Sequence, residues 1–359
     1  MWPQNPLLAR LGIEHPIIQA PMAGGPSTPE LAAAVSEAGA LGSWAGGYLP
    51  PEAIRGAIRD IRQLTGRPFG VNLFAPLPAE RAPTPEELAR ANAAVEPFRR
   101  ELGLAAPERP AARPRFEEQL EAILEEGVPV FSFTFGALGA ATVRRLRERG
   151  ILVMGTATTP GEAAELEREG VDAVVAQGAE AGGHRGTFAG PPEGGLIGTL
   201  ALVPQVVDRV RVPVVAAGGI MDGRGLAAAL ALGASAAQMG TAFLATPESG
   251  ASPVYKEAVL GPADEDRTAL TRAFSGRLAR GVRNRFMVEV ERAGAILPFP
   301  DQNALTQDIR QAAARGRRAE MLSLWAGQAV PLATARRARE VVEATVSQAR
   351  EVLRRLRSP

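Results

Sequence analysis

Short apolar runs alternate along the chain with longer polar or alanine-rich runs. Within the short runs, hydrophobic residues follow one another instead of occupying every second position, which is typical of strands buried on both faces of a parallel sheet. Eight strands are predicted, near residues 17–22, 41–45, 69–74, 129–135, 151–156, 173–178, 212–217 and 235–242. Eight strands alternating with helices predict an α/β fold of the (β/α)8 (TIM) barrel type, with an open doubly wound sheet as the alternative.

Glycines and hydroxyl residues mark the predicted helix ends. Glycine just past a helix adopts the left-handed conformation that closes it. Six glycines follow helical runs and are predicted to be such caps: Gly39, Gly66, Gly127, Gly150, Gly170 and Gly233. Three pairs place a hydroxyl three residues before a glutamate, the pattern of a capping box at a helix start: Ser27–Glu30, Thr84–Glu87 and Thr159–Glu162.

Two regions interrupt the alternation of predicted strands and helices. Residues 76–115 are rich in proline, alanine, glutamate and arginine, and are predicted to form a helical insertion between the third and fourth strands. Residues 246–359 are predicted to form a mostly helical cap region packed on the barrel, which leaves residues 1–245 for the barrel itself. The sequence therefore predicts one large barrel with a smaller helical part.

Composition narrows the possible chemistry. The chain has no cysteine, which excludes disulfides, thiol nucleophiles and thiolate metal sites, and no metal site is predicted. A net charge of +1 gives no electrostatic argument for nucleic-acid binding. Residues 225–247 carry no charge, but glycine and polar residues interrupt them, so they are interpreted as a helix, a glycine cap and a strand, with no membrane association. Residues 1–9 do not have the pattern of a signal peptide, and a cytoplasmic protein is expected.

Polar and glycine residues collect where the predicted strands end. In a barrel of this type the active site lies at the carboxyl ends of the strands. The residues at those ends are Met22, Asn72, Gly136, Thr156, Gln177, Gly218, Gly219, Met239, Gly240 and Thr241. Any one of them can be explained as a turn residue, but the set together favours a ligand site.

The segment Q-G-A-E-A-G-G-H-R-G at 177–186 contains the predicted catalytic residue, His184. Its glycines allow close approach of the backbone to a ligand, and a near-neutral imidazole can accept a proton at physiological pH. The other histidine, His15, precedes the first strand and is interpreted as a structural residue at the bottom of the barrel. Arg185 is either a donor to an anionic substrate or a solvent-facing loop residue.

The loops after the seventh and eighth strands predict a phosphate site. They read A-A-G-G-I at 216–220 and Q-M-G-T-A-F at 238–243. In such barrels these two loops commonly bind phosphate through backbone N–H groups. We therefore expect a phosphorylated cofactor whose reactive end lies near His184; a phosphate-sugar isomerase or lyase without a redox cofactor is an alternative.

Seven segments together resemble the nitronate monooxygenases, formerly called 2-nitropropane dioxygenases. They are P-I-I-Q-A-P-M-A-G-G at 16–25, F-G-V-N-L-F at 69–74, Q-G-A-E-A-G-G-H-R-G at 177–186, P-V-V-A-A-G-G-I at 213–220, Q-M-G-T-A-F at 238–243, F-S-G-R-L-A-R-G-V-R-N-R-F at 274–286 and L-W-A-G-Q at 324–328. The resemblance thus extends through most of the chain.

This resemblance implies that FMN-dependent oxidation with O2 converts alkyl nitronates to a carbonyl compound and nitrite. Nitroalkanes are a further option as substrates. His184 would act as the base and would orient the substrate. By the pattern of the family, the flavin would be held by Asn72, Gln177, Gly182, Gly218, Gly219, Gln238, Met239, Gly240 and Thr241, with Met22 and Ala23 near its ring. A homodimer is an option that the sequence leaves open.

One departure and one rival affect this interpretation. Several bacterial members line the substrate pocket with tyrosines and a lysine from their C-terminal part, but here no tyrosine follows Tyr255 and no lysine follows Lys256.

The glycine–histidine loop at 177–186 also resembles NAD(P)H-dependent FMN enzymes of this superfamily, namely enoyl-acyl-carrier-protein reductases and quinone reductases. The continuation H-R-G-T-F at 184–188 favours the nitronate enzymes.

Overall fold

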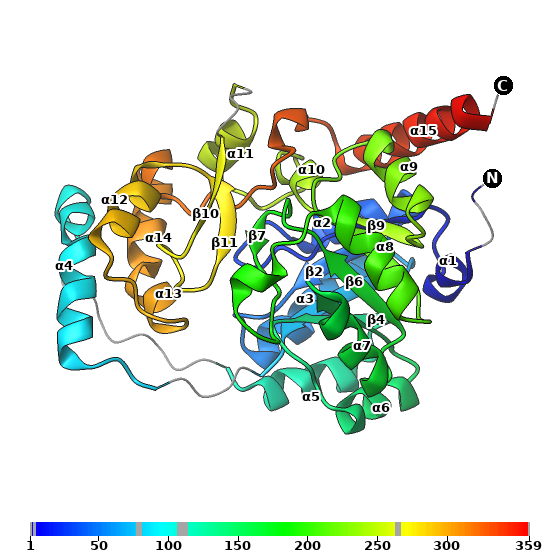
Figure 1. Cartoon of the computed structure of the whole chain (residues 1–359), viewed down its shortest axis with the longest axis horizontal. Helices are drawn as coiled ribbons and strands as arrows, with labels where there is room; N and C mark the ends of the chain where they lie inside the picture. Colours follow the sequence, from blue (N-terminus) through cyan, green and yellow to red (C-terminus); the bar gives the residue numbers. More distant parts are fainter. Residues whose placement is uncertain (1, 3–4, 77–80, 106–113, 263–266, 358–359) are drawn as a thin grey trace.

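The computed structural model describes residues 2, 5–76, 81–105, 114–262 and 267–357. Figure 1 shows two lobes side by side, a larger one built around a parallel sheet and a smaller, mostly helical one. Within the described ranges, we find no helix with the length and apolar character that crossing a bilayer requires.

The larger lobe is a (β/α)8 barrel, which confirms the predicted fold class. All eight predicted strands form, and they pair in parallel in the order β1-β9-β8-β6-β5-β4-β3-β2. Their bounds are β1 (Ile17–Gln19), β2 (Gly42–Ala45), β3 (Phe69–Phe74), β4 (Val130–Thr134), β5 (Leu152–Ala157), β6 (Ala173–Gln177), β8 (Val214–Ala217) and β9 (Ala236–Met239). A parallel bridge between Ile18 and Leu41 joins β1 to β2 and closes the ring.

Helices cover the outside of this ring. They are α2 (Pro29–Glu37), α3 (Pro51–Leu64), α5 (Phe116–Glu126), α6 (Ala140–Glu148), α7 (Pro160–Glu169), α8 (Thr199–Arg209) and α9 (Gly223–Ala231). The last helix of the chain, α15 (Ala338–Arg357), packs against α9 and α2 and therefore takes the place of the helix after the final strand. The chain thus leaves the barrel after β9, forms most of the second lobe, and returns to close the helical layer.

Most predicted helix ends are confirmed, with three corrections. Five of the six glycines have positive φ at helix ends: Gly39, Gly127, Gly150, Gly170 and Gly233. Gly66 does not, because α3 already ends at Leu64 and Thr65 leaves the helix in an extended conformation. Thr84 and Glu87 form the expected capping box of α4. Thr159 caps α7, but its predicted capping box is incomplete, because the Glu162 carboxylate accepts from Thr158, Phe188 and Ala189 instead. The cap of α2 is Thr28 and not Ser27, whose hydroxyl instead accepts from the backbone N–H of Met22 at 2.8 Å.

The second lobe has its own hydrophobic core. Its elements are α4 (Pro85–Glu101), α11 (Pro253–Val259), β10 (Thr268–Thr271), β11 (Ala279–Val282), α12 (Arg285–Ala293), α13 (Asp301–Leu305), α14 (Gln307–Arg315) and the 3-10 helix η2 (Ala319–Met321). Val95 and Phe98 of α4 join that core beside Phe286 and Ile309. The described part of the predicted insertion is therefore helical and packs on the second lobe (Figure 1).

Short elements complete the fold. Helix α1 (Pro6–Leu11) buries Leu7 and Leu11 against the amino-terminal end of the barrel interior. The remaining short elements are β7 (Gly183–His184), η1 (Pro192–Gly195), α10 (Thr241–Leu244) and η3 (Val330–Leu332). β7 leaves the barrel lobe and pairs antiparallel with β11, so the two lobes share a three-stranded sheet.

Candidate active site

The interior of the barrel changes from apolar to polar toward the carboxyl ends of its strands. Successive strand residues face opposite sides, so every second residue points inward. Ile18, Val130 and Leu152 form the apolar lower part. Above them, Asn72 of β3 donates to the hydroxyl of Ser132 of β4 at 2.9 Å. The change places hydrogen-bonding groups at the end of the barrel where ligands bind.

The glycine–histidine loop covers this polar end. A Cβ added at Gly186 would lie 3.0 Å from Thr156, 3.1 Å from Thr134 and 3.4 Å from Gln177, so the backbone there rests directly on the ends of β4, β5 and β6. The Gln177 side chain donates to the carbonyl of His184 at 3.1 Å and accepts from Gly186 N–H at 2.8 Å. Gln177 therefore fixes the loop in addition to any contact with a cofactor.

His184 lies between the two lobes. Its backbone pairs with Ala279 of β11, and its Nε2 lies 2.8 Å from Oγ of the buried Ser275. The Ser275 hydroxyl is 3.1 Å from the carbonyl of Arg277, to which it donates. With the hydroxyl in this direction, its oxygen accepts from Nε2–H, and the lone pair of the imidazole is on Nδ1.

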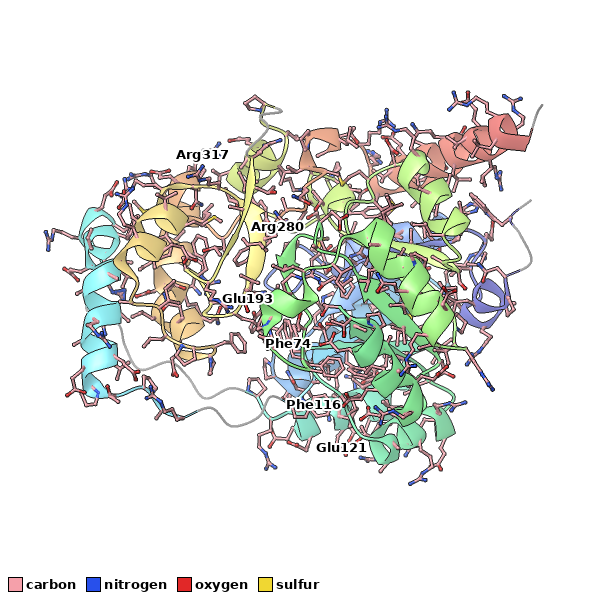
Figure 2. The ribbon with its side chains drawn as sticks, in the orientation of Figure 1. Phe74, Phe116, Glu121, Glu193, Arg280 and Arg317 are labelled. Carbon is pink, nitrogen blue, oxygen red and sulfur yellow. The ribbon has the colours of Figure 1, made fainter. Side chains whose placement is uncertain are left out.

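Aromatic rings from both lobes surround His184. Its ring centroid is 5.9 Å from that of Phe135, which follows β4, and 5.2 Å from that of Trp325 in the second lobe. Phe135 in turn lies 4.9 Å from Phe74, and Phe74 lies 5.0 Å from Tyr48. Figure 2 shows Phe74 at the boundary of the lobes, below Arg280 of β11. The rings cover part of the imidazole, which is half-buried.

The surroundings of His184 are positively charged. Burial lowers the pKa of His184 to about 3, and the positive charges of Arg277 and Arg310 add to this effect. The Arg277 guanidinium lies 4.2 Å from the centroid of Phe135, and both arginines belong to the second lobe. At neutral pH the imidazole is therefore uncharged and lies in a field that attracts anions.

Neither expectation for Arg185 is correct. The side chain is 1% exposed, so it does not face solvent. Its guanidinium donates to the carbonyls of Gly178, Gln177 and Gly195 at 2.6, 2.7 and 3.0 Å, so it stabilises the loop and is not directed at a substrate. The reason is that the loop folds back over its own backbone, where buried carbonyls need donors.

The predicted phosphate loops lie next to each other and contain tight backbone contacts. Gly218 and Gly219 after β8 have φ of 116° and 70°, a conformation that favours glycine. After β9, a Cβ added at Gly240 would lie 3.4 Å from Ala20 and 3.9 Å from the Met22 sulfur. The loops that contain Met22, Gly219 and Gly240 therefore surround one part of the barrel opening, where β1, β9 and β8 are neighbours.

Other predicted cofactor residues contact the second lobe. A Cβ added at Gly182 would lie 2.5 Å from the backbone of Ala326, and the Thr241 hydroxyl accepts from Gly327 N–H at 3.0 Å. Both contacts involve the L-W-A-G-Q segment. The half-buried side chain of Gln238 makes no hydrogen bond to any residue in the described ranges. Its amide is thus available to a ligand.

His15 lies at the opposite end of the barrel, as expected. The Trp2 indole nitrogen donates to its Nδ1 at 3.4 Å, and burial lowers its pKa. The polar groups of Tyr255 and Lys256 are directed at backbone carbonyls: the Tyr255 hydroxyl donates to the carbonyl of Trp325 at 2.5 Å, and the Lys256 amine donates to that of Thr246 at 2.7 Å.

Sequence reasoning missed five residues around His184: Tyr48, Ser275, Arg277, Arg310 and Trp325. Three of them belong to segments whose resemblance to a family was noted, F-S-G-R at 274–277 and L-W-A-G-Q at 324–328, but no role was assigned to them. A search for cations and hydroxyl groups within those segments would have found Ser275 and Arg277. Nothing in the local pattern indicates Arg310 or Tyr48.

The fold and the site define the class of protein. It is a (β/α)8-barrel protein whose candidate active site lies at the carboxyl ends of the strands and is completed by residues of a second lobe. The family model of nitronate monooxygenase matches residues 5–348. A probable nitronate monooxygenase of Staphylococcus aureus (strain MSSA476) is 44% identical over 356 residues, 98% of this chain and 99% of the relative.

Solved structures agree with this match. A nitroalkane oxidase from Streptomyces ansochromogenes has a TM-score of 0.91 and 43% identity, covering 97% of this chain and 99% of that one. FabK from Thermotoga maritima has a TM-score of 0.77 and 33% identity, covering 99% of each chain. The chain belongs to the nitronate monooxygenase family and is an oxidoreductase.

Proposed function

We propose that this protein catalyses the FMN-dependent oxidation of alkyl nitronates with O2, giving a carbonyl compound and nitrite. The family and the similarity to the Streptomyces nitroalkane oxidase support the reaction class. The observation that carries the proposal is the uncharged His184, which lies over the barrel opening between aromatic rings and within the field of two arginines.

The residues at the barrel opening suit FMN. The left-handed backbone at Gly218 and Gly219 and the adjacent Gly240–Thr241 turn provide backbone N–H groups for a phosphate, at the place where such barrels bind one. Asn72 and Gln238 offer side-chain amides inside the opening, and Met22, the residue before Ala23, lies beside Gly240 at its edge. Bound FMN would supply the electron acceptor and the site of reaction with O2.

A nitronate anion suits the charge of the site better than a neutral nitroalkane. Arg277 and Arg310, which disfavour a proton on His184, would stabilise a negative charge beside it. The neutral Nδ1 can accept a proton from a nitroalkane carbon, but the low pKa of His184 makes it a weak base. We therefore expect nitronates to be turned over much faster than their conjugate nitroalkanes.

A visible spectrum of the purified protein tests this proposal. Under anaerobic conditions, the spectrum of oxidised FMN should be bleached by propionate 3-nitronate and should persist with NADH or NADPH. A colourless protein that cannot be reconstituted with FMN would contradict the cofactor and favour the isomerase or lyase alternative.

The second candidate function is an NAD(P)H-dependent FMN reductase. FabK from Thermotoga maritima, whose name differs from nitronate monooxygenase, is 33% identical to this chain over 99% of both chains. This similarity favours the alternative. Bleaching by a nicotinamide, without any response to nitronate, would establish it and would leave the proposed flavin site unchanged.

A further inference from the structure

One ion pair attaches the insertion helix α4 to the second lobe. Arg99 is 2% exposed, and its Nη1 and Nη2 donate to a single oxygen of Asp308 on α14, at 2.7 and 2.6 Å. The Arg99 Nε is buried and has no partner among the described residues. Such a pair adds little net stability, since desolvation offsets most of the attraction and apolar residues could attach the helix as well. The pair therefore calls for an explanation beyond docking.

Arg310 lies two residues after Asp308 on the same helix. Its guanidinium donates to the carbonyl and side-chain oxygens of Asn303, both at 2.9 Å, and to the carbonyl of Thr306 at 3.3 Å. No carboxylate in the described ranges forms an ion pair with it. The positive charge of Arg310 is thus held in place by neutral oxygens and is not cancelled.

A chain of contacts connects this helix to the reaction centre. The Thr306 hydroxyl donates to the carbonyl of Phe274, and the next residue, Ser275, contacts His184. Burial and the charge of Arg277 lower the pKa of His184, and the charge of Arg310 adds to this effect. Burial also lowers the pKa of Arg310 itself, and the charges of Tyr48 and Asp308 act against that shift, so Asp308 lies close enough to act on Arg310. Unless its charge is neutralised, the Asp308 carboxylate therefore opposes the field that attracts an anion.

We propose that Arg99 is a positioning residue that neutralises Asp308 and thereby preserves the positive field of Arg310 toward an anionic substrate. The insertion would then act on substrate binding through this pair and would not contact the substrate. This inference rests on the proposed function, in which the substrate is a nitronate anion received near Arg310.

Steady-state kinetics of the flavin-loaded enzyme test the inference. Arg99→Met should raise KM for propionate 3-nitronate by about three- to tenfold, as expected for one uncompensated charge near the site, and should change kcat by less than about twofold. The KM for neutral nitroethane should stay within about twofold of the wild type. High salt should reduce the difference in KM between variant and wild type, because the freed Asp308 is 42% exposed and can be screened.

A double variant separates charge from docking. Arg99→Met combined with Asp308→Asn removes both charges, so KM for the nitronate should return to within about twofold of the wild type, and Arg99→Lys should remain close to it. If the double variant is as impaired as Arg99→Met, or if Arg99→Met leaves KM unchanged, the inference is wrong and the pair serves only to attach α4.

Arg310→Met distinguishes this failure from failure of the proposed function. A raised KM for the nitronate in Arg310→Met, together with an unchanged KM in Arg99→Met, would overturn only the role of Arg99. An unchanged KM in Arg310→Met would overturn the anion site at Arg310 and the inference with it.

Discussion

Replacement of Glu162 by glutamine gives a sharp test of how the loop that contains His184 is held. Glu162 on α7 is fully buried and accepts four hydrogen bonds. One carboxylate oxygen accepts from the N–H and hydroxyl of Thr158 at 2.6 and 2.8 Å, and the other from the N–H groups of Phe188 and Ala189 at 2.6 and 2.9 Å. The carboxylate thereby joins α7 to the segment just after His184.

The expected cost follows from these contacts. The new amide nitrogen should face Thr158, since the Thr158 hydroxyl can turn toward Thr187, 2.8 Å away, and accept from the amide. The N–H of Thr158 then loses its partner, and the bonds to Phe188 and Ala189 lose the assistance of a charge. One unpaired buried N–H costs about 1–3 kcal/mol, and we expect a total of about 3 kcal/mol.

Thermal unfolding and kinetics measure the effect. Glu162→Gln should lower Tm by roughly 5 °C, and kcat should fall less than in Glu162→Ala, which frees all four donors. Glu165→Gln on the same helix is the matched control, because it removes the same charge from a half-buried residue without a hydrogen bond to any described residue. An unchanged Tm in Glu162→Gln, or an equal loss in the control, would refute this reasoning.

The remaining predictions concern the site itself. His184→Asn should retain FMN, as judged by its visible spectrum, but lose most turnover of neutral nitroalkanes; unchanged turnover would remove His184 from the mechanism. Gly219→Leu should release FMN, because residue 219 has φ of 70° and a Cβ there lies 3.3 Å from Glu180; full flavin content by absorbance would show that the phosphate loop is elsewhere. Because the pKa of His184 is lowered to about 3 from 6.5, the unfolded chain binds a proton between these values that the folded chain does not. Stability should therefore fall as pH decreases from about 6.5 toward 3, and less so in His184→Asn; equal pH dependence of urea unfolding in both proteins would contradict the shift.

The sequence alone determined the barrel, and it singled out His184 as the candidate catalytic residue. Strands buried on both faces need uninterrupted apolar runs, and the helices between them need polar faces and capping residues, so the eight strands could be predicted from local pattern. His184 could be singled out because glycines on both sides let its loop lie on the strand ends. At Gly186 an added Cβ would lie within 3.0–3.4 Å of Thr156, Thr134 and Gln177. The predicted caps Gly66 and Ser27 were wrong by one residue each, since Thr65 ends α3 and Thr28 begins α2. Two adjacent residues can end or begin a helix at little difference in energy.

Only the tertiary structure decided what surrounds His184. Ser275 lies 91 residues away in sequence, and the Arg99–Asp308 pair joins residues 209 apart. Arg185, which looked like a surface or substrate residue, is buried because its own loop folds over it. No local pattern encodes such contacts, since each joins residues that are far apart in sequence or buries a side chain by the folding of a loop, and the contact of Ser275 with His184 exists only after the second lobe has docked on the barrel. That docking sets the charge and the low pKa of His184, and so the chemistry that the site can perform.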